Sequence, residues 1–442
     1  MPDTLVSHDL TRRAVMRGGA ALGAGAMLAG VPLGSVAFAQ NAAARWPNVA
    51  GFVNSYVDQR KVAGMIAALG WQQAAPQYVA AGSRVFGGAD RVGPDTLFRI
   101  YSMTKPVTGI AAMMCIEDGL FGLDQPLHEI LPAYRNMRVQ KVYDGPITAD
   151  NLEPAQRPIT MRHLLTHTAG LGYGIIQSGP IREAYAARGI VPGAVSRMEI
   201  AQRFMGGTPA PSLEAFADRL AELPLVAQPG KRWIYSVGLD LMGRVIEVAS
   251  GQPFDRFLKR RIFDPLGMES TGFRVARGEA GRLAGNYFLL GGMPVPIDLP
   301  QSSIFLDEPA FPFGGAGLVS SARDYDRFLQ MLAGFGAFEG RQLVSEPTAR
   351  LAMSDLFPDT LLATGRFTSG GRSYGFGAGG LVGTGQSEGL FGWFGAAGTA
   401  GLVNHAIGLR HTLMTQYMPA ESYDVQQRFP VVVAQDAMAM RQ

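Results

Sequence analysis

The stretch FRIYSMTKPVTGIAAMM, residues 98–114, decides the predicted fold and chemistry of this chain. From Ser102 onward the apolar residues recur at helical spacing, and Pro106 is compatible with the first turn of a helix that begins there. Ser102 and Lys105 then share one face of the helix, because residues three apart are neighbours. Of the 39 Lys and Arg residues only five are Lys, so a lysine at this place is unusual.

The identity of the base matters for chemistry. A lysine ammonium can lose its proton when burial or neighbouring charges favour the neutral amine, whereas a guanidinium stays protonated in proteins. The N-terminus of a helix also favours negative charge that develops on the Ser102 oxygen. Ser102 and Lys105 are therefore a candidate nucleophile and base. The alternative is a capping serine beside a surface lysine, because this spacing alone is not specific.

Four segments of the chain, in order, resemble the family of serine β-lactamases, penicillin-binding proteins and family VIII carboxylesterases. They are residues 97–127, which contain the Ser-x-x-Lys motif as SMTK, and residues 159–174, 228–273 and 314–332. The resemblance is closest to the carboxylesterases related to class C β-lactamases. It implies a β-lactamase/transpeptidase-like fold and a serine hydrolase that forms an acyl-enzyme on Ser102.

The resemblance implies a third catalytic residue in the segment IYSVG. The family motif Tyr-x-Asn falls on residues 235–237, where Tyr235 is present and Val237 stands in place of the asparagine. Tyr235 would share proton transfer with Lys105. A phenol becomes a usable base when an adjacent cation stabilises its anion.

The family's Lys-Thr-Gly strand motif falls on residues 393–395, within GWFGAAGTAG. By resemblance, the backbone N–H of Ala396 joins that of Ser102 as an oxyanion hole. Tyr101, Trp393 and Gly395 are the predicted substrate-binding residues, and the glycine lets the backbone approach the substrate.

The departures from the family pattern predict the substrate class. In β-lactamases the lysine of the third motif holds the substrate carboxylate and the asparagine holds an amide, but here an indole and a valine occupy these places. An uncharged acyl substrate in an aromatic pocket fits better. We therefore expect hydrolysis of short-chain neutral carboxylic esters. If cephalosporins were cleaved, Arg366 or Arg372 would be candidates for the missing carboxylate clamp.

Other functions use the same residues and stay open at this stage. A β-lactamase, a D-Ala-D-Ala peptidase and an acyltransferase are alternatives to the esterase. A non-enzymatic peptidoglycan-binding module is disfavoured, because a binder has no need of Ser102, Lys105 and Tyr235 together. The sequence leaves open the natural substrate, the oligomeric state, and which of Lys105 and Tyr235 is the primary base.

The order of elements predicts an α/β fold of the α+β type. Two strands are expected in GMIAALG and QYVAAGSRVF, two more in GTAGLVNH and RHTLMTQYM, and a helix from Gln426 onward. Between them the pattern is mainly helical, with a helix from Leu239 to Ser250 that stops at Gly251. We expect one antiparallel sheet flanked by helices and built from residues of about 40–120 and 300–442. A mainly helical lobe of about 120–300 is inserted between these parts.

The first 39 residues have the pattern of a leader. TRRAVMRGG precedes an apolar Gly/Ala-rich run that ends in Ala37-Phe38-Ala39, a small-x-small cleavage site. The paired Arg12-Arg13 predicts twin-arginine export and a periplasmic location. The hydrolase domain would then span residues 40–442. No membrane anchor is expected after cleavage behind Ala39, because the run is rich in Gly and Ala and interrupted by Pro32.

Composition and motif counts argue against other partners. A net charge of +3 is too small to hold nucleic acid or anionic lipid. The single cysteine, Cys115, is expected to be a buried hydrophobe. The histidines form no metal-binding pattern, and His163 and His167 are expected to pack or to bond loops. We expect no cofactor and no metal, and a small-molecule ester as the binding partner.

One competing nucleophile motif is present. GQSEG at residues 385–389 matches the Gly-x-Ser-x-Gly elbow of α/β-hydrolases, which needs a strand before Ser387 and a helix after it. The surrounding residues form a glycine-dense loop pattern, and only Glu388 lies between this serine and His405. Ser387 is therefore interpreted as a loop serine.

Overall fold

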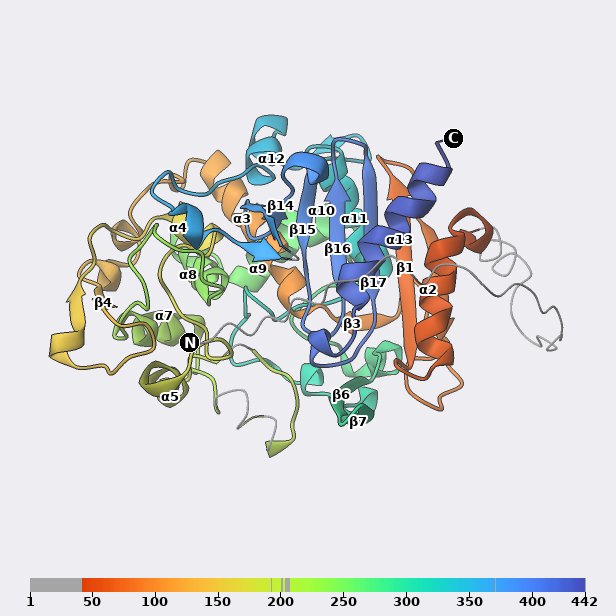
Figure 1. Cartoon of the computed structure of the whole chain (residues 1–442), viewed down its shortest axis with the longest axis horizontal. Coiled ribbons are helices and arrows are strands. Elements are labelled where there is room, and N and C mark those ends of the chain that lie inside the picture. The colour runs from red at the N-terminus through yellow and green to blue at the C-terminus, as the bar shows by residue number, and fades with distance from the viewer. Residues whose placement is uncertain (1–41, 192, 200–201, 203–206, 370, 442) are drawn as a thin grey trace.

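The computed structural model describes residues 42–191, 193–199, 202, 207–369 and 371–441, and Figure 1 shows the whole chain. The predicted leader, residues 1–39, lies outside the described residues. Within the described ranges, no helix is both long enough and apolar enough to cross a bilayer.

The centre of the fold is an antiparallel sheet, to which the described residues contribute seven strands. Strand β1 from the N-terminal part pairs with β17 from the C-terminal part, with Ile66 opposite Met414. The sheet is thus built from both ends of the chain, and the predicted fold class is confirmed. In spatial order the strands are β13 (Gly375–Phe376), β14 (Leu381–Val382), β15 (Leu390–Phe394), β16 (Ala400–Asn404), β17 (Leu409–Met414), β1 (Gly64–Trp71) and β2 (Gln77–Gly82).

The period-two alternation of the strands supplies both faces of the sheet. Met65, Ala67 and Leu69 of β1 pack with α2 (Pro47–Asp58) and α13 (Val425–Ala439), which lie side by side over one face in Figure 1. The residues between them, Ile66 and Ala68, join the main core with α3 (Thr104–Glu117) and α11 (Ala322–Ala333). Both faces of β1 are therefore buried, and this strand reads as a continuous apolar run.

Helix α3 lies in the middle of the main core. Every residue from Thr104 to Cys115 is buried, which fits a helix that is mostly apolar all round. At Gly109 a Cβ atom would collide with the backbone carbonyl of Ala378, so only glycine allows this approach between the helix and the turn that joins β13 to β14. The helix that carries Lys105 is therefore fixed along its length.

Several helices lie in the chain between β2 and β13, and four of them, α4, α5, α7 and α8, lie together at the left of Figure 1. Helix α8 ends at Ser250, as the sequence predicted, and its C-cap Gly251 is left-handed with a φ of 66°. The helices are α4 (Met161–Leu165), α5 (Gly179–Ala187), α7 (Leu213–Ala221), α8 (Gly238–Ser250), α9 (Phe254–Leu258) and α10 (Asp264–Leu266), followed further along the chain by α12 (Glu346–Ala352).

Small strand pairs complete the fold. Strand β2 ends at Gly82 rather than at Phe86, because Gly82 has a φ of 80° and turns the chain away. A hairpin that the sequence analysis did not predict also lies in the middle region. The pairs are β3 (Leu97–Arg99) with β8 (Val319–Ser321), β4 (Arg138–Gln140) with β5 (Leu152–Pro154), the unpredicted hairpin β6 (Asn286–Leu290) with β7 (Met293–Asp298), β9 (Ala337–Phe338) with β10 (Arg341–Gln342), and β11 (Thr368–Ser369) with β12 (Arg372–Ser373).

Candidate active site

Ser102 lies in a short 3-10 helix, Tyr101–Met103, between β3 and α3. Tyr101 has a φ of 41°, a left-handed conformation that costs energy in a residue with a side chain. The conformation is held by Asn286, whose amide donates to the Tyr101 hydroxyl at 3.1 Å, and by the edge-on ring of Phe305. Ser102 is partly exposed, whereas its neighbours Tyr101 and Met103 are buried.

Lys105 points at the serine. Its Nζ lies 3.2 Å from Ser102 Oγ and donates to the carbonyl oxygen of Gly315 at 2.7 Å. The side chain is fully buried, with the Nζ 4.5 Å from the ring centroid of Tyr235 and 5.6 Å from that of Tyr173. The sequence-predicted trio of serine, lysine and tyrosine is thus brought together in space.

A carboxylate that the sequence analysis missed stands behind Lys105. Asp240, in the first turn of α8, accepts a hydrogen bond from the backbone N–H of Gly315 at 2.8 Å, and the carbonyl oxygen of the same residue accepts from Lys105, so one residue links the carboxylate to the ammonium. Burial raises the pKa of Asp240 to about 6, although the charge of Lys105 and the Gly315 hydrogen bond oppose the rise. Its position five residues after Tyr235 is the only sequence signal that could have found it.

Tyr235 lies in an aromatic cluster. The indole N–H of Trp393 donates to the Tyr235 hydroxyl at 3.1 Å, and the two ring centroids are 5.7 Å apart. We define the aromatic cluster as five residues, each in ring contact with at least two of the others: Trp233, Tyr235, Phe367, Phe376 and Trp393. The position where β-lactamases carry a lysine is therefore held by an uncharged donor that contacts the phenol.

The end of β15 brings a second backbone donor toward Ser102. A Cβ atom on Gly395 would lie 2.5 Å from the carbonyl oxygen of Ile100, so glycine is required for this approach. Among the described residues, neither the Ser102 N–H nor the Ala396 N–H has a hydrogen-bond acceptor. Two backbone N–H groups without acceptors are the donors that an oxyanion hole requires.

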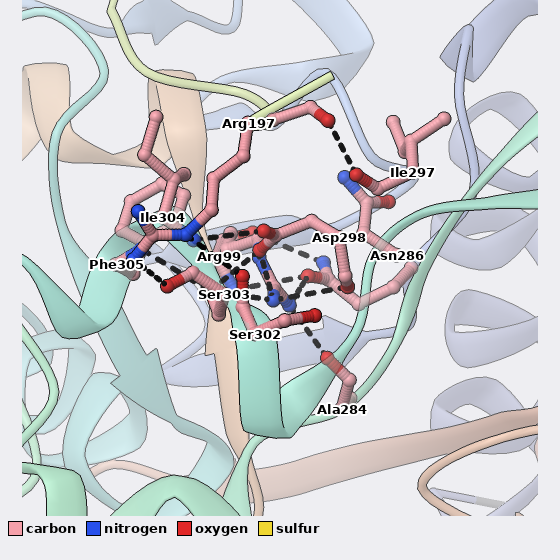
Figure 2. A network of polar contacts seen from close by, with 12 residues as sticks. Arg99, Arg197, Ala284, Asn286, Ile297, Asp298, Ser302, Ser303, Ile304 and Phe305 are labelled. Carbon is pink, nitrogen blue, oxygen red and sulfur yellow. Dashed lines mark hydrogen bonds and ion pairs between the residues drawn. The ribbon is translucent and has the colours of Figure 1, made fainter.

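A buried ion-pair network supports the strand before the serine, and Figure 2 shows it from close by. Arg99 donates to Asp298 Oδ2 at 2.7 Å from its Nε and also contacts the carbonyl oxygen of Ala284 at 2.5 Å. Asp298 in turn accepts from the Ser303 hydroxyl at 2.6 Å and from the Ile304 N–H at 2.9 Å. The network thereby fixes the segment that carries Phe305 to Tyr101.

A cavity of about 300 Å³ lies next to this segment. Phe305 and Gly317 line it, and Phe305 also contacts Tyr101, but Ser102 itself is not part of its wall. Apolar residues make up much of the remaining lining: Val191, Ala194, Val195, Phe273, Ile304 and Phe313.

The other predicted residues are placed as follows. Ser387 ends a 3-10 helix that leads into strand β15, so the strand–turn–helix of a nucleophile elbow is not formed there. Arg366 forms an ion pair with Asp355 at 3.2 Å, and the side chain of Arg372 lies outside the described ones. Cys115 is buried, and the described residues hold no group of side chains suited to a metal ion.

His163 and His167 have different local roles. The His163 ring accepts from the Thr160 N–H at 3.1 Å and completes the N-terminal cap of α4. His167 is fully buried against Tyr235, with ring centroids 4.8 Å apart.

Comparison with known proteins gives a consistent result. The family model described as "Beta-lactamase" matches residues 49–434. Esterase EstB of Burkholderia gladioli is 32% identical over 361 residues, which cover 75% of this chain and 81% of the esterase.

Two solved structures have the same fold. EstCE1, described as a hydrolase with promiscuous acyltransferase activity, has a TM-score of 0.69 at 26% identity and covers 91% of this chain and 99% of its own. Unliganded simvastatin synthase from Aspergillus terreus has a TM-score of 0.69 at 23% identity, covering 90% of this chain and 99% of its own.

Proposed function

This chain belongs to the beta-lactamase family, and we propose that it hydrolyses short, uncharged carboxylic esters through an acyl-enzyme on Ser102. At a coarser level it is a serine hydrolase or acyltransferase of the β-lactamase fold. The observation that carries the finer proposal is the contact of Lys105 Nζ with Ser102 Oγ at 3.2 Å. Beside it, the Tyr235 hydroxyl accepts a hydrogen bond from the uncharged indole of Trp393, where a β-lactamase would have a lysine.

Acylation follows from these contacts. Lys105 Nζ accepts the proton of Ser102 as Oγ forms a bond to the ester carbonyl carbon. The carbonyl electron pair moves onto its oxygen, where the N–H groups of Ser102 and Ala396 stabilise the negative charge. As the bond to the alkoxide breaks, the proton passes to the leaving oxygen with Tyr235 sharing the transfer. The products are an acyl ester on Ser102 and a free alcohol.

Deacylation reverses these roles with water. The same base removes a proton from a water molecule, the hydroxide oxygen attacks the acyl carbon, and Ser102 Oγ leaves with the proton. The carboxylic acid is released and the serine is regenerated.

The preference for uncharged esters rests on the aromatic cluster. All five of its side chains are uncharged, and Trp393 is 8% exposed. Arg366, one of the two arginine candidates from the sequence, is already paired with Asp355. An anionic β-lactam would have to bury its carboxylate without a partner, which costs several kcal/mol.

Covalent labelling tests the nucleophile. A fluorophosphonate probe should add once, at Ser102, in intact-mass and peptide analysis. The Ser102→Ala variant should take up no probe, and Ser387→Ala, the matched control, should be labelled at the wild-type rate. Probe found on Ser387 instead would overturn the proposed nucleophile.

A substrate panel tests the class. The specificity constant for p-nitrophenyl butyrate should exceed that for nitrocefin by about 100-fold or more, the ratio expected from several kcal/mol of unpaired charge. A nitrocefin constant above that of the ester would overturn the ester assignment.

Acyl transfer is the second candidate, and its support is the printed description of EstCE1 as a hydrolase with promiscuous acyltransferase activity. The acyl-enzyme would be the same, with an alcohol in place of water. Chromatography of products formed from a vinyl ester in the presence of 1-butanol separates the two: butyl ester indicates transfer, and free acid alone indicates hydrolysis.

A further inference from the structure

His167 occupies a strained and fully enclosed position directly after α4. Its φ is 56°, in the left-handed region that few residues other than glycine and asparagine adopt. Its side chain is 0% exposed. Both the backbone strain and the burial of two ring nitrogens cost free energy. A residue that only filled space would not need to be a histidine in this conformation.

The contacts of His167 are directed to both neighbours of Tyr235. The backbone N–H of Ile234 donates to the His167 carbonyl oxygen at 2.8 Å. The backbone N–H of Ser236 donates to His167 Nδ1 at 3.3 Å, and the Ser236 hydroxyl lies 3.0 Å from the same nitrogen. The imidazole itself packs against the Tyr235 ring at a centroid distance of 4.8 Å and an angle of 55°.

The hydrogen bonds also define the state of the ring. Because Nδ1 accepts the Ser236 N–H, the ring proton is on Nε2. Nε2 is buried and has no hydrogen-bond partner among the described residues, while Trp233 and Phe376 pack edge-on to the ring. Burial, assisted by the charge of Lys105, holds the pKa of His167 well below its usual value, so the ring stays a neutral acceptor.

The position of the Tyr235 side chain depends on its backbone, because the side chain makes few polar contacts of its own. Its hydroxyl has one hydrogen-bond partner among the described residues, Trp393. A change in the backbone at residue 234 or 236 would move the phenol away from both Lys105 and Trp393.

We propose that His167 is a positioning residue that holds Tyr235 over Lys105 by fixing the backbone on both sides of the tyrosine. The proposal rests on the proposed function, because Tyr235 takes part in the proton transfer there. His167 itself does not touch the reacting atoms.

Three substitutions separate this role from simple packing. His167→Leu and His167→Gln remove the acceptor at the Nδ1 position, since leucine has none and glutamine carries its carbonyl one bond too far. His167→Asn keeps a carbonyl oxygen near that position and tolerates the left-handed backbone. His411→Leu is the matched control, because His411 is equally buried, has both ring nitrogens unpartnered, and packs on Phe429 of α13 instead.

The assay is steady-state hydrolysis of p-nitrophenyl butyrate, with Ser102 labelling by the fluorophosphonate as the single-turnover measure. For the Leu and Gln variants we expect kcat and the labelling rate to fall about 100-fold with little change in KM, as expected when a general acid–base group is misplaced by an ångström. The Asn variant should recover to within about fivefold of wild type. The His411→Leu control should keep its kcat even where its melting temperature falls.

Folding of each variant is checked by circular dichroism. If the Leu variant does not fold, the Gln variant carries the comparison with Asn. A folded Leu or Gln variant that is as fast as wild type, or an Asn variant as slow as the other two, would overturn the positioning role. Failure of the wild-type protein to label at Ser102 would instead overturn the proposed function, so the two failures are distinguishable.

Discussion

Arg99 and Lys105 are two fully buried cations six positions apart in the chain, and their surroundings differ completely. The Arg99 guanidinium is bonded directly to the Asp298 carboxylate. The Lys105 ammonium donates hydrogen bonds to a hydroxyl and a carbonyl oxygen, and its nearby carboxylate, Asp240, is linked to it through the residue Gly315. An arginine paired directly with a carboxylate stays charged and has a structural role, whereas a lysine with neutral partners can lose and regain its proton and so act as a base.

A second buried arginine in the core is also paired directly with a carboxylate. Arg410 is also fully buried and forms a direct ion pair with Asp326 at 3.0 Å. Structural charge in this core is thus carried by arginine with a carboxylate, which explains why a lysine at residue 105 stood out in the sequence.

The largest expected effect on activity comes from placing an arginine at residue 105, as at residue 99. Lys105→Arg keeps the charge but removes the amine that can lose its proton and act as a base, so kcat/KM for p-nitrophenyl butyrate should fall at least about 1000-fold, nearly as far as in Lys105→Ala. Steady-state kinetics on folded variants checks this. An arginine variant with near-normal turnover would show that charge alone suffices at this position.

Breaking the structural pair should affect stability instead. Asp298→Ala leaves the Arg99 guanidinium buried without its carboxylate, which should lower the free energy of unfolding by about 3–5 kcal/mol. Urea unfolding measures the loss. Glu346→Ala, which breaks the exposed pair with Arg350, is the control and should change stability by less than about 0.5 kcal/mol. Equal effects of the two substitutions would contradict the role assigned to the buried network.

The dependence of stability on pH tests the carboxyl of Asp240, which is linked to Lys105 through Gly315. Because burial raises its pKa to about 6, the folded state binds a proton more tightly than the unfolded chain, so this carboxyl lowers stability as the pH rises from about 4 to 6. Asp240→Asn stays neutral and should gain stability relative to wild type across that window, by at most about 3 kcal/mol at 1.36 kcal/mol per pKa unit. Urea unfolding of both proteins at pH 4, 5, 6 and 7 gives the difference. Parallel curves for the two would mean that Asp240 is ionised throughout.

The smallest expected effect concerns the indole donor. Trp393→Phe removes the N–H that reaches the Tyr235 hydroxyl and should lower kcat about tenfold or less, the equivalent of one net hydrogen bond. Trp233→Phe is the matched control from the same aromatic cluster, because its indole N–H has no hydrogen-bond partner among the described residues. A larger loss in the control than in Trp393→Phe would argue that packing, not the donor, matters.

Sequence patterns were most informative where the interaction is local. The contact of Lys105 with Ser102 follows from a spacing of three residues on one helix, and the terminal strands follow from short apolar runs. The Gly315 carbonyl that accepts from Lys105 comes from 210 residues away and acts through its backbone, so no side-chain pattern marks it.

Other features were missed for related physical reasons. Asp240 looks like an ordinary first-turn helix acid, and only the fold buries it. The hairpin β6–β7 contains Pro294 and Pro296, which weaken a strand pattern, yet both are tolerated in a pair that does not join the central sheet.

The pairing of β1 with β17 also determines when the protein can fold. The Thr415 hydroxyl donates to the carbonyl oxygen of Gly64 across a separation of 351 residues, and β17 is the neighbour of both β1 and β16. A nascent chain on the ribosome therefore holds β1 and β2 without their partner until almost the whole protein has been synthesised. Contacts so distant in sequence slow folding, and the exposed edge of β1 is open to other chains during that time. Chains cut short before β17 would keep Ser102 and Lys105 but lose the strand that joins the two parts of the sheet.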